Sequence, residues 1–284
     1  LNPSSICPGL LKGYRNDYFR KMTRTFSSSE NKKRRKRAGK KRWGQHFLAD
    51  TNLLKKLVEL ISPTSDDSIL EIGPGGGALT ELLAPIVKEL VGIEIDRELY
   101  GHLKERDDLP NCQFVNRDFL RVDLKEIPFK ARQVRVVGNL PYNITSPILF
   151  KLTAHDPFWR DCHFMVQKEV GERMAAKAGS KTYGRLSVNL QAVAKVKIVL
   201  NVPPEVFVPK PKVDSAVVRI KPRSAVFNSS RELEALQVIT RLAFGQRRKM
   251  LRNSLASLKI DSSLFDLTYR PEKVNLEEFI MMAK

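Results

Sequence analysis

The sequence predicts an α/β fold whose mostly parallel sheet is covered by helices on both faces, followed by a small all-helical segment. Short apolar runs of strand character recur along the middle of the chain, at residues 69–72, 90–95, 114–115, 134–137, 164–166, 196–200 and 216–220. Helical or loop segments separate them, and this alternation is typical of parallel sheets buried on both faces. After Pro222 the pattern becomes helical, with no further strand candidate.

Helix signals flank these strands. Asp50 and Thr51 can cap a first helix, which Pro63 ends. In the C-terminal part, apolar positions at helical spacing mark a longer helix, and Pro271 with Glu272 fits the first turn of a final short one. We therefore expect a basic extension (1–42), an α/β domain (43–222) and a helical domain (223–284).

The net charge of +19 is distributed unevenly. Residues 1–42 hold 14 Lys/Arg against 2 Asp/Glu, which leaves 36 against 29 in the rest of the chain. Dense like charge buries little apolar surface, so we predict that the extension is disordered. The alternatives for it are a solvated tail, an RNA-gripping arm, a transit peptide, or a mis-assigned start with Met22 as the initiator. The moderate surplus elsewhere favours a polyanionic partner.

Composition excludes several classes of protein. No run approaches 18 consecutive apolar residues, so no membrane span is predicted. The cysteines and histidines show neither disulfide nor metal-ligand spacing, and we predict a reducing compartment and no metal. These residues are Cys7, Cys112, Cys162, His46, His102, His155 and His163.

A glycine-rich loop follows the first predicted strand and precedes a helix, at residues 71–80. Gly73 and Gly75 let the backbone approach a nucleotide-like ligand, and Glu94, at the end of the second strand, can accept both ribose hydroxyls. A dinucleotide-binding dehydrogenase would share these features, although Pro74 interrupts its usual glycine spacing. Asp118, after the third strand, can accept from an adenine amine, and a simple cap is its alternative role.

The fourth strand ends in Asn139, Leu140, Pro141 and Tyr142. An adenine amine becomes a better nucleophile when acceptors hold its hydrogens, and the Asn139 side-chain oxygen with the Leu140 carbonyl can do this. Pro141 would fix the direction of that carbonyl, and Tyr142 would stack on the base. An ordinary strand-to-loop turn is the alternative.

A proline-rich loop between two later strands carries Phe207. We predict that Phe207 is displayed there and closes the second face of an extruded base, with a core position as the alternative. Basic residues on both sides of this pocket suggest a phosphate-lined groove. They are Lys168, Arg173, Lys210, Lys212, Arg247, Arg248, Lys249 and Arg252.

Together these motifs resemble the ribosomal RNA adenine N6-dimethyltransferase family, from about residue 43 to about residue 279. The matching segments occur in the family's order, at residues 44–48, 71–75, 92–96, 138–144 and 207–215. The resemblance implies a Rossmann-like methyltransferase domain, S-adenosylmethionine as donor and two adjacent dimethyladenosines in small-subunit rRNA as product. It also implies donor contacts from Gln45, His46, Leu48 and Asn139 beside those already named, and a target-base pocket of Asn139, Leu140, Pro141, Tyr142 and Phe207.

The partner implied is the assembling small ribosomal subunit, with the enzyme acting as a monomer. Residues 244–253 resemble the bacterial branch, which implies a cytoplasmic enzyme, whereas the long extension leaves a mitochondrion or plastid open. Two alternatives remain at this point. One is a large-subunit rRNA adenine methyltransferase of the antibiotic-resistance type, and the other is a non-catalytic assembly or transcription factor on the same fold.

Overall fold

The computed structural model describes residues 46–129, 133–153 and 158–284, so the predicted extension (1–42) lies outside it. The helices are α3 (Thr51–Ile61), α4 (Thr80–Leu83), α5 (Arg97–Lys104), α6 (Thr145–Thr153), α7 (Lys168–Ala175), α8 (Arg185–Val193), α9 (Ser230–Gly245), α10 (Leu251–Ser254) and α11 (Leu276–Ala283). The strands are β1 (Phe47–Leu48), β2 (Ser68–Ile72), β3 (Glu89–Glu94), β4 (Cys112–Asn116), β5 (Val134–Asn139), β6 (Trp159–Gln167), β7 (Ala194–Val202), β8 (Phe207–Val208) and β9 (Ser215–Pro222). No helix in the described ranges combines the length and apolar character needed to cross a bilayer.

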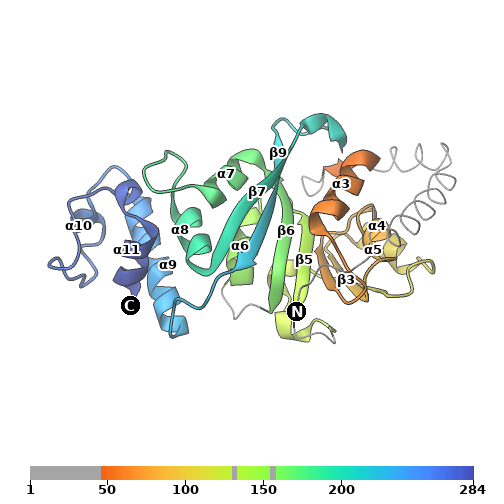
Figure 1. Ribbon diagram of the computed structural model, residues 1–284, viewed down its shortest axis with the longest axis horizontal. Coiled ribbons are helices and arrows are strands. Elements are labelled where there is room, and N and C mark those ends of the chain that lie inside the picture. Colours follow the sequence, from red (N-terminus) through yellow and green to blue (C-terminus); the bar gives the residue numbers. More distant parts are fainter. Residues whose placement is uncertain (1–45, 130–132, 154–157) are drawn as a thin grey trace, which may run out of the picture. The chain divides into compact units, whose positions relative to one another are not determined.

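Within the described residues the main sheet has seven strands in the order β4-β3-β2-β5-β6-β9-β7. Strands β4 to β6 run parallel, while β9 is antiparallel to both β6 and β7 (Figure 1). The predicted α/β fold with a mostly parallel sheet is thus confirmed, and each predicted apolar run overlaps one of these strands.

Both faces of the sheet are covered, as alternate residues of β5 show. Val136 packs into a core with side chains of α6, α7 and α8, whereas Val137 packs with side chains of α3 and α4. Coverage on both faces explains why all five residues of β2 are buried, with no alternation between buried and exposed positions.

The first helix begins as predicted. Asp50 Oδ1 accepts a hydrogen bond from the Leu53 backbone N–H at 2.7 Å, which caps α3. The helix ends at Ile61, and Ser62 then adopts a left-handed conformation (φ 50°) just before Pro63.

The C-terminal helices form a second core. Leu236 and Ile239 of α9 pack with Phe279 and Ile280 of α11, and Tyr183 and residues of α8 join them. The prediction for Pro271 is wrong in detail. Pro271 begins a separate 3-10 turn, because Asn275 caps α11 by accepting from the Glu278 N–H at 2.9 Å. The domain boundary near residue 222, where β9 ends, stays a prediction.

Gly138 permits the close contact of β5 with β2. A Cβ at this position would lie 2.6 Å from the Ile72 carbonyl oxygen, a backbone atom that cannot move without distorting the sheet. We expect Gly138→Ala to lower the free energy of unfolding by about 1–3 kcal/mol in urea denaturation. Gly101→Ala in α5, where no atom lies within 4 Å of the new Cβ, is the control and should be neutral or stabilising. Equal effects of the two variants would contradict the role of this contact.

Candidate active site

The parallel strands end at one edge of the sheet, where the glycine loop follows β2. Gly73, Gly75 and Gly77 have φ of +68°, +60° and +81°, values that residues with a Cβ rarely adopt. The Gly73 N–H donates to the Ile93 carbonyl at 2.9 Å, which ties the loop to β3. A Cβ on Gly75 would lie 3.2 Å from the Phe47 ring. The loop therefore exposes backbone where a ligand can approach closely.

Glu94 lies at the end of β3, directly beside this loop. Its side chain is buried, and its carboxylate accepts from the Gly75 N–H and the Asp96 N–H, each at 2.9 Å. Burial raises the pKa of this carboxyl, although the two backbone hydrogen bonds oppose the shift. Each carboxylate oxygen keeps a second lone pair, so Glu94 can still accept from ligand hydroxyls.

Glu71 opens the glycine-loop motif, and no role was predicted for it. Glu71 is buried on β2, and its Oε2 accepts from the Thr80 hydroxyl at 2.6 Å. Burial raises the pKa of Glu71 to about 7 although the Thr80 hydrogen bond opposes this shift, and the nearby Glu94 charge adds a smaller increase. Glu71 thus joins β2 to the start of α4 beneath the loop.

Asp118 follows β4 and caps a 3-10 turn. Its Oδ1 accepts from the Leu120 N–H at 2.9 Å, and its Oδ2 lies 3.7 Å from Arg121 Nε. The side chain is 30% exposed, so the capping role does not remove it from solvent. Its predicted contact with an adenine amine stays a prediction.

The Asn139 side chain is hydrogen-bonded to the segment that precedes α3. Its Nδ2 donates to the His46 carbonyl at 2.7 Å, which directs the amide oxygen away from His46. His46 Nδ1 in turn donates to the Pro209 carbonyl at 2.7 Å, so this nitrogen carries the ring proton. The His46 ring stacks on Tyr142, with centroids 5.5 Å apart and planes inclined by 28°.

Tyr142 is also held through its hydroxyl group. Its hydroxyl lies 2.7 Å from Ser215 Oγ, at the start of β9, and burial raises the pKa of Tyr142 despite that hydrogen bond. The Ser215 contact was not anticipated, although Ser215 closes the predicted motif at residues 207–215. A ring held at both ends keeps one orientation, as a stacking platform requires.

Leu140 and Pro141 anchor the turn after β5. The Leu140 side chain is buried, and its N–H donates to the Met165 carbonyl at 3.0 Å. The Pro141 carbonyl accepts from the Ile144 N–H and the Thr145 hydroxyl, each at 3.1 Å, which begins α6. The turn is therefore rigid on both sides.

The prediction that Phe207 is displayed on its loop is wrong. Its side chain is 2% exposed and packs with Leu57, Met165 and Val217. The reason is a two-stranded sheet in which β8 pairs antiparallel with β1, so that Phe207 lies opposite Leu48 and both side chains face this core. A contact of Phe207 with a bound base stays a prediction.

The predicted RNA contacts fall into three groups. Lys168, Arg173 and Lys210 form ion pairs with Asp214, Glu169 and Glu205 respectively. Arg247 donates to the Lys181 and Tyr183 carbonyls at 3.1 and 2.9 Å and so joins the helical part to the loop before α8. The others are exposed: Lys212, Arg248, Lys249 and Arg252.

Two further expectations concern ligands of the chain. Gln45, predicted to contact the donor, lies outside the described residues. In the described ranges, no three side chains of His, Cys, Asp or Glu gather as a metal site would require.

Comparisons with known proteins agree with this geometry. The family model described as ribosomal RNA adenine dimethylase matches residues 36–279. The chain is 45% identical over 248 residues to ribosomal RNA small subunit methyltransferase A of Leptothrix cholodnii, covering 86% of this chain and 90% of that protein. It is 43% identical to the protein of the same name from Xylella fastidiosa, over 86% of this chain and 94% of that one.

Solved structures show the same fold. A dimethyladenosine transferase from Plasmodium falciparum superposes with a TM-score of 0.72 at 27% identity, over 84% of this chain and 96% of that one. The 23S rRNA methyltransferase ErmE superposes with a TM-score of 0.62 at 26% identity, over 84% of this chain and 99% of that one.

The raised pKa of Glu71 predicts a pH-dependent stability. The pKa of Glu71 is about 7 in the folded chain, against an ordinary value of 4.5 in the unfolded chain. The folded state therefore binds more protons between pH 4.5 and pH 7, and its stability falls as pH rises through this range. We expect the free energy of unfolding of Glu71→Gln, relative to that of the wild type, to rise by roughly 2 kcal/mol between pH 5 and pH 7.5. Urea denaturation at both pH values measures this. Glu105→Gln, at an exposed position of the same chain, should show no such gain.

Proposed function

The chain belongs to the ribosomal RNA adenine dimethylase family, and we propose that it transfers methyl groups from S-adenosylmethionine to the N6 amines of two adjacent adenines in small-subunit rRNA. The observation that carries this proposal is the Asn139 amide, oriented by His46 and placed beside Tyr142 at the strand end next to the glycine loop. This arrangement suits a flat base that carries an amino group.

The residues at the glycine loop fit the methyl donor. S-adenosylmethionine would supply a sulfonium methyl group to an incoming nucleophile. Gly73 and Gly75 would let the donor approach the backbone of the loop closely, and Glu94 would accept hydrogen bonds from the donor's ribose hydroxyls. Asp118, 30% exposed at the end of the next strand, would accept from its adenine amine.

The chain's own contribution to the reaction is positioning. With its amide nitrogen bound to His46, Asn139 presents an oxygen that would accept from the target N6–H, while the Leu140 carbonyl would accept from the other hydrogen. These acceptors favour a tetrahedral nitrogen whose lone pair is free to attack. Tyr142 would hold the ring by stacking. Methylation would leave N6 cationic and strongly acidic, so its proton could pass to water and no base with a strongly shifted pKa is needed, while alignment would supply much of the rate.

The partner in this proposal is the assembling small ribosomal subunit, and the enzyme acts as a monomer. The proposed compartment is the bacterial cytoplasm, or an organelle if the basic extension is a transit peptide. The similarity of the solved large-subunit enzyme ErmE to this fold makes large-subunit rRNA the substrate to test against.

One experiment separates the candidate functions. The protein is incubated with labelled S-adenosylmethionine and undermethylated small subunits, naked large-subunit rRNA, or no RNA, and the methylated bases are mapped. Dimethylation of two adjacent adenines in the small subunit is the expected result. Methylation confined to large-subunit rRNA would refute the substrate, and no transfer to either RNA would favour a non-catalytic assembly factor.

Asn139→Ala tests the role of the amide. We expect methyl transfer to small subunits to fall by at least about a hundredfold, because an acceptor for the N6 hydrogen is lost, while binding of S-adenosylmethionine stays measurable. Calorimetry measures donor binding, and Asn201→Ala, at an exposed position of β7, controls for unspecific loss. An Asn139→Ala enzyme with wild-type activity would refute the proposed role.

A further inference from the structure

A polar pocket of about 320 Å³ lies at the opposite edge of the sheet from the glycine loop, where β5 and β6 begin. Arg135 near the start of β5 and Asn139 at its end are four residues apart, or roughly 13 Å along an extended strand. The pocket is therefore distinct from the candidate active site. Its lining residues are Leu60, Ile61, Ser62, Arg135, Arg160, Asp161, His163, Arg219 and Lys221.

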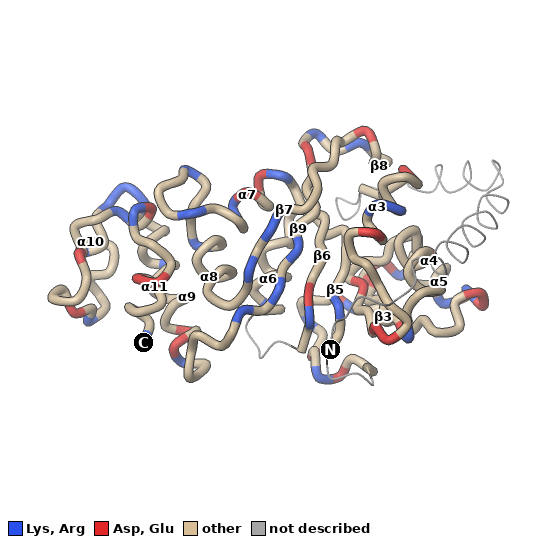
Figure 2. The backbone as a smooth tube through the Cα atoms, in the orientation of Figure 1, with Lys and Arg blue, Asp and Glu red and all other residues tan. Residues whose placement is uncertain are grey.

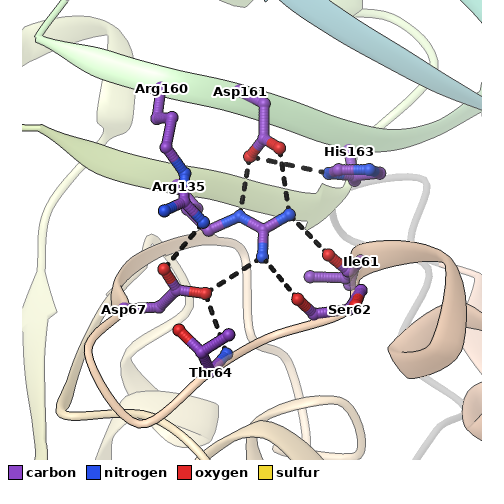
Figure 3. Close-up of polar contacts among 8 residues, drawn as sticks. All are labelled: Ile61, Ser62, Thr64, Asp67, Arg135, Arg160, Asp161 and His163. Carbon is purple, nitrogen blue, oxygen red and sulfur yellow. Dashed lines mark hydrogen bonds and ion pairs between the residues drawn. The ribbon is translucent and has the colours of Figure 1, made fainter. Parts of the chain in front are cut away.

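The floor of this pocket is a neutral, closed network (Figure 3). Arg135 binds Asp161 with two hydrogen bonds, of 2.8 and 2.9 Å, and binds Asp67 at 3.0 Å. Arg160 binds the second oxygen of Asp67 at 2.7 Å. Two arginines and two aspartates thus neutralise one another, and the Arg135 side chain is only 6% exposed. The network leaves the remaining cations of the pocket uncompensated.

The remaining cations of the pocket, Arg219 and Lys221, lie on β9, and two lysines of the neighbouring strand β7 face them. In the antiparallel register Lys195 is directly opposite Lys221, and Lys197 is directly opposite Arg219. Figure 2 shows the resulting line of basic residues along the two strands. Directly opposed like charges destabilise a sheet, and within the described part of the chain none of the four has an acidic partner. We call these four residues the basic ladder.

Protection of a sheet edge does not explain the basic ladder. Lysines on an edge strand hinder pairing with other chains, which accounts for Lys195 and Lys197 on β7. However, β9 lies inside the sheet, between β6 and β7, so Arg219 and Lys221 protect no edge. Their presence opposite two lysines points instead to an anionic ligand.

His163 provides an independent indication. Its side chain is 2% exposed and lines the pocket, yet neither ring nitrogen has a hydrogen-bond partner in the described structure. Nδ1 lies 3.9 Å from Asp161 Oδ1, too far for a hydrogen bond. Burial lowers the pKa of His163 to about 4 even though the Asp161 charge opposes this, so the ring is neutral at pH 7 and carries one N–H. An unpaired buried donor is costly, and a ligand oxygen would satisfy it.

We propose that this pocket and the basic ladder bind the phosphate backbone of the RNA substrate, with one phosphate oxygen accepting from His163. The inference rests on the proposed function, since it concerns the same RNA whose adenine enters the active site. Phosphate oxygens match the chemistry of the site, because they accept from Arg, Lys and a neutral imidazole alike. Side chains on one face of a strand repeat about every 6.6 Å, so the basic ladder can follow successive phosphates. A free inorganic phosphate would share this chemistry.

The first test compares two triple variants of the full chain, Lys195→Ala/Lys197→Ala/Lys221→Ala and the control Lys88→Ala/Lys104→Ala/Lys125→Ala. The control residues are also exposed but lie on other parts of the chain. Binding to undermethylated small subunits is measured from 50 to 200 mM salt. We expect the ladder variant to bind about tenfold more weakly, with a salt slope smaller by about 2–3, while the control matches the wild type. Equal behaviour of the two variants overturns the proposal.

The second test follows His163 directly. The ring resonances of the protein labelled at histidine are recorded during titration with an rRNA fragment, with inorganic phosphate and with chloride at equal ionic strength. Assignment uses His163→Phe. We expect RNA to shift the His163 signal at concentrations where inorganic phosphate has little effect. A shift with phosphate but not with RNA reassigns the site to a free anion, and no shift with either refutes it.

The outcomes for the site and for the proposed function are distinguishable. If the wild type methylates small subunits and the ladder variant binds them normally, the phosphate site fails and the proposed function stands. If the wild type neither binds nor methylates RNA while inorganic phosphate still shifts His163, the proposed function fails, and the RNA assignment of the pocket fails with it.

Discussion

The close contact of β5 with β2 at Gly138 is the constraint on which the candidate active site depends. The parallel register sets Glu71 opposite Val137, so the ends of the two strands are neighbours. Only a residue without a Cβ fits where the Ile72 carbonyl approaches Gly138. As a result, the glycine loop after β2 and the Asn139 turn after β5 begin side by side. A donor and an acceptor of a methyl group need that proximity.

The same strand carries a second structural role at its other end. Arg135 joins β5 to Asp161 on β6 and to Asp67 before β2, and it also donates to the carbonyl of Ser62 at the end of α3. A buried ion network of this kind contributes little net stability compared with an apolar replacement, because all three of its charges are desolvated. Its effect is better described as specificity, since a shift of β5 by one residue would leave the charges of Arg135, Asp67 and Asp161 buried without partners.

Much of this architecture could be predicted from the sequence, because buried parallel strands are rich in apolar residues and positive φ values favour glycine. The order of Gly73, Glu94 and Asp118 along the chain indicates a nucleotide site from the sequence alone. The contacts that orient Asn139 could not be predicted in this way. They come from His46 and Pro209, which are far apart in the chain, and strands of two residues show no hydrophobic period. Phe207 was misjudged because the surrounding prolines indicate an exposed loop, while the burial of its ring depends on that same long-range pairing. No role could be predicted for His163 either, since an isolated histidine in an apolar strand resembles any core residue.

The pairing of β1 with β8 has a consequence for the order of events during synthesis. His46 contacts Pro209 across 163 positions, so the loop that this contact closes contains nearly the whole α/β part of the chain. At about 5–20 residues per second, a ribosome needs roughly 8–30 s to make that stretch. Until residues 207–208 have been made, β1 has no partner strand, so the β1–β8 pairing cannot hold the His46 carbonyl at the Asn139 amide. The contact that orients the amide therefore depends on β8, one of the last strands of the α/β part to be made.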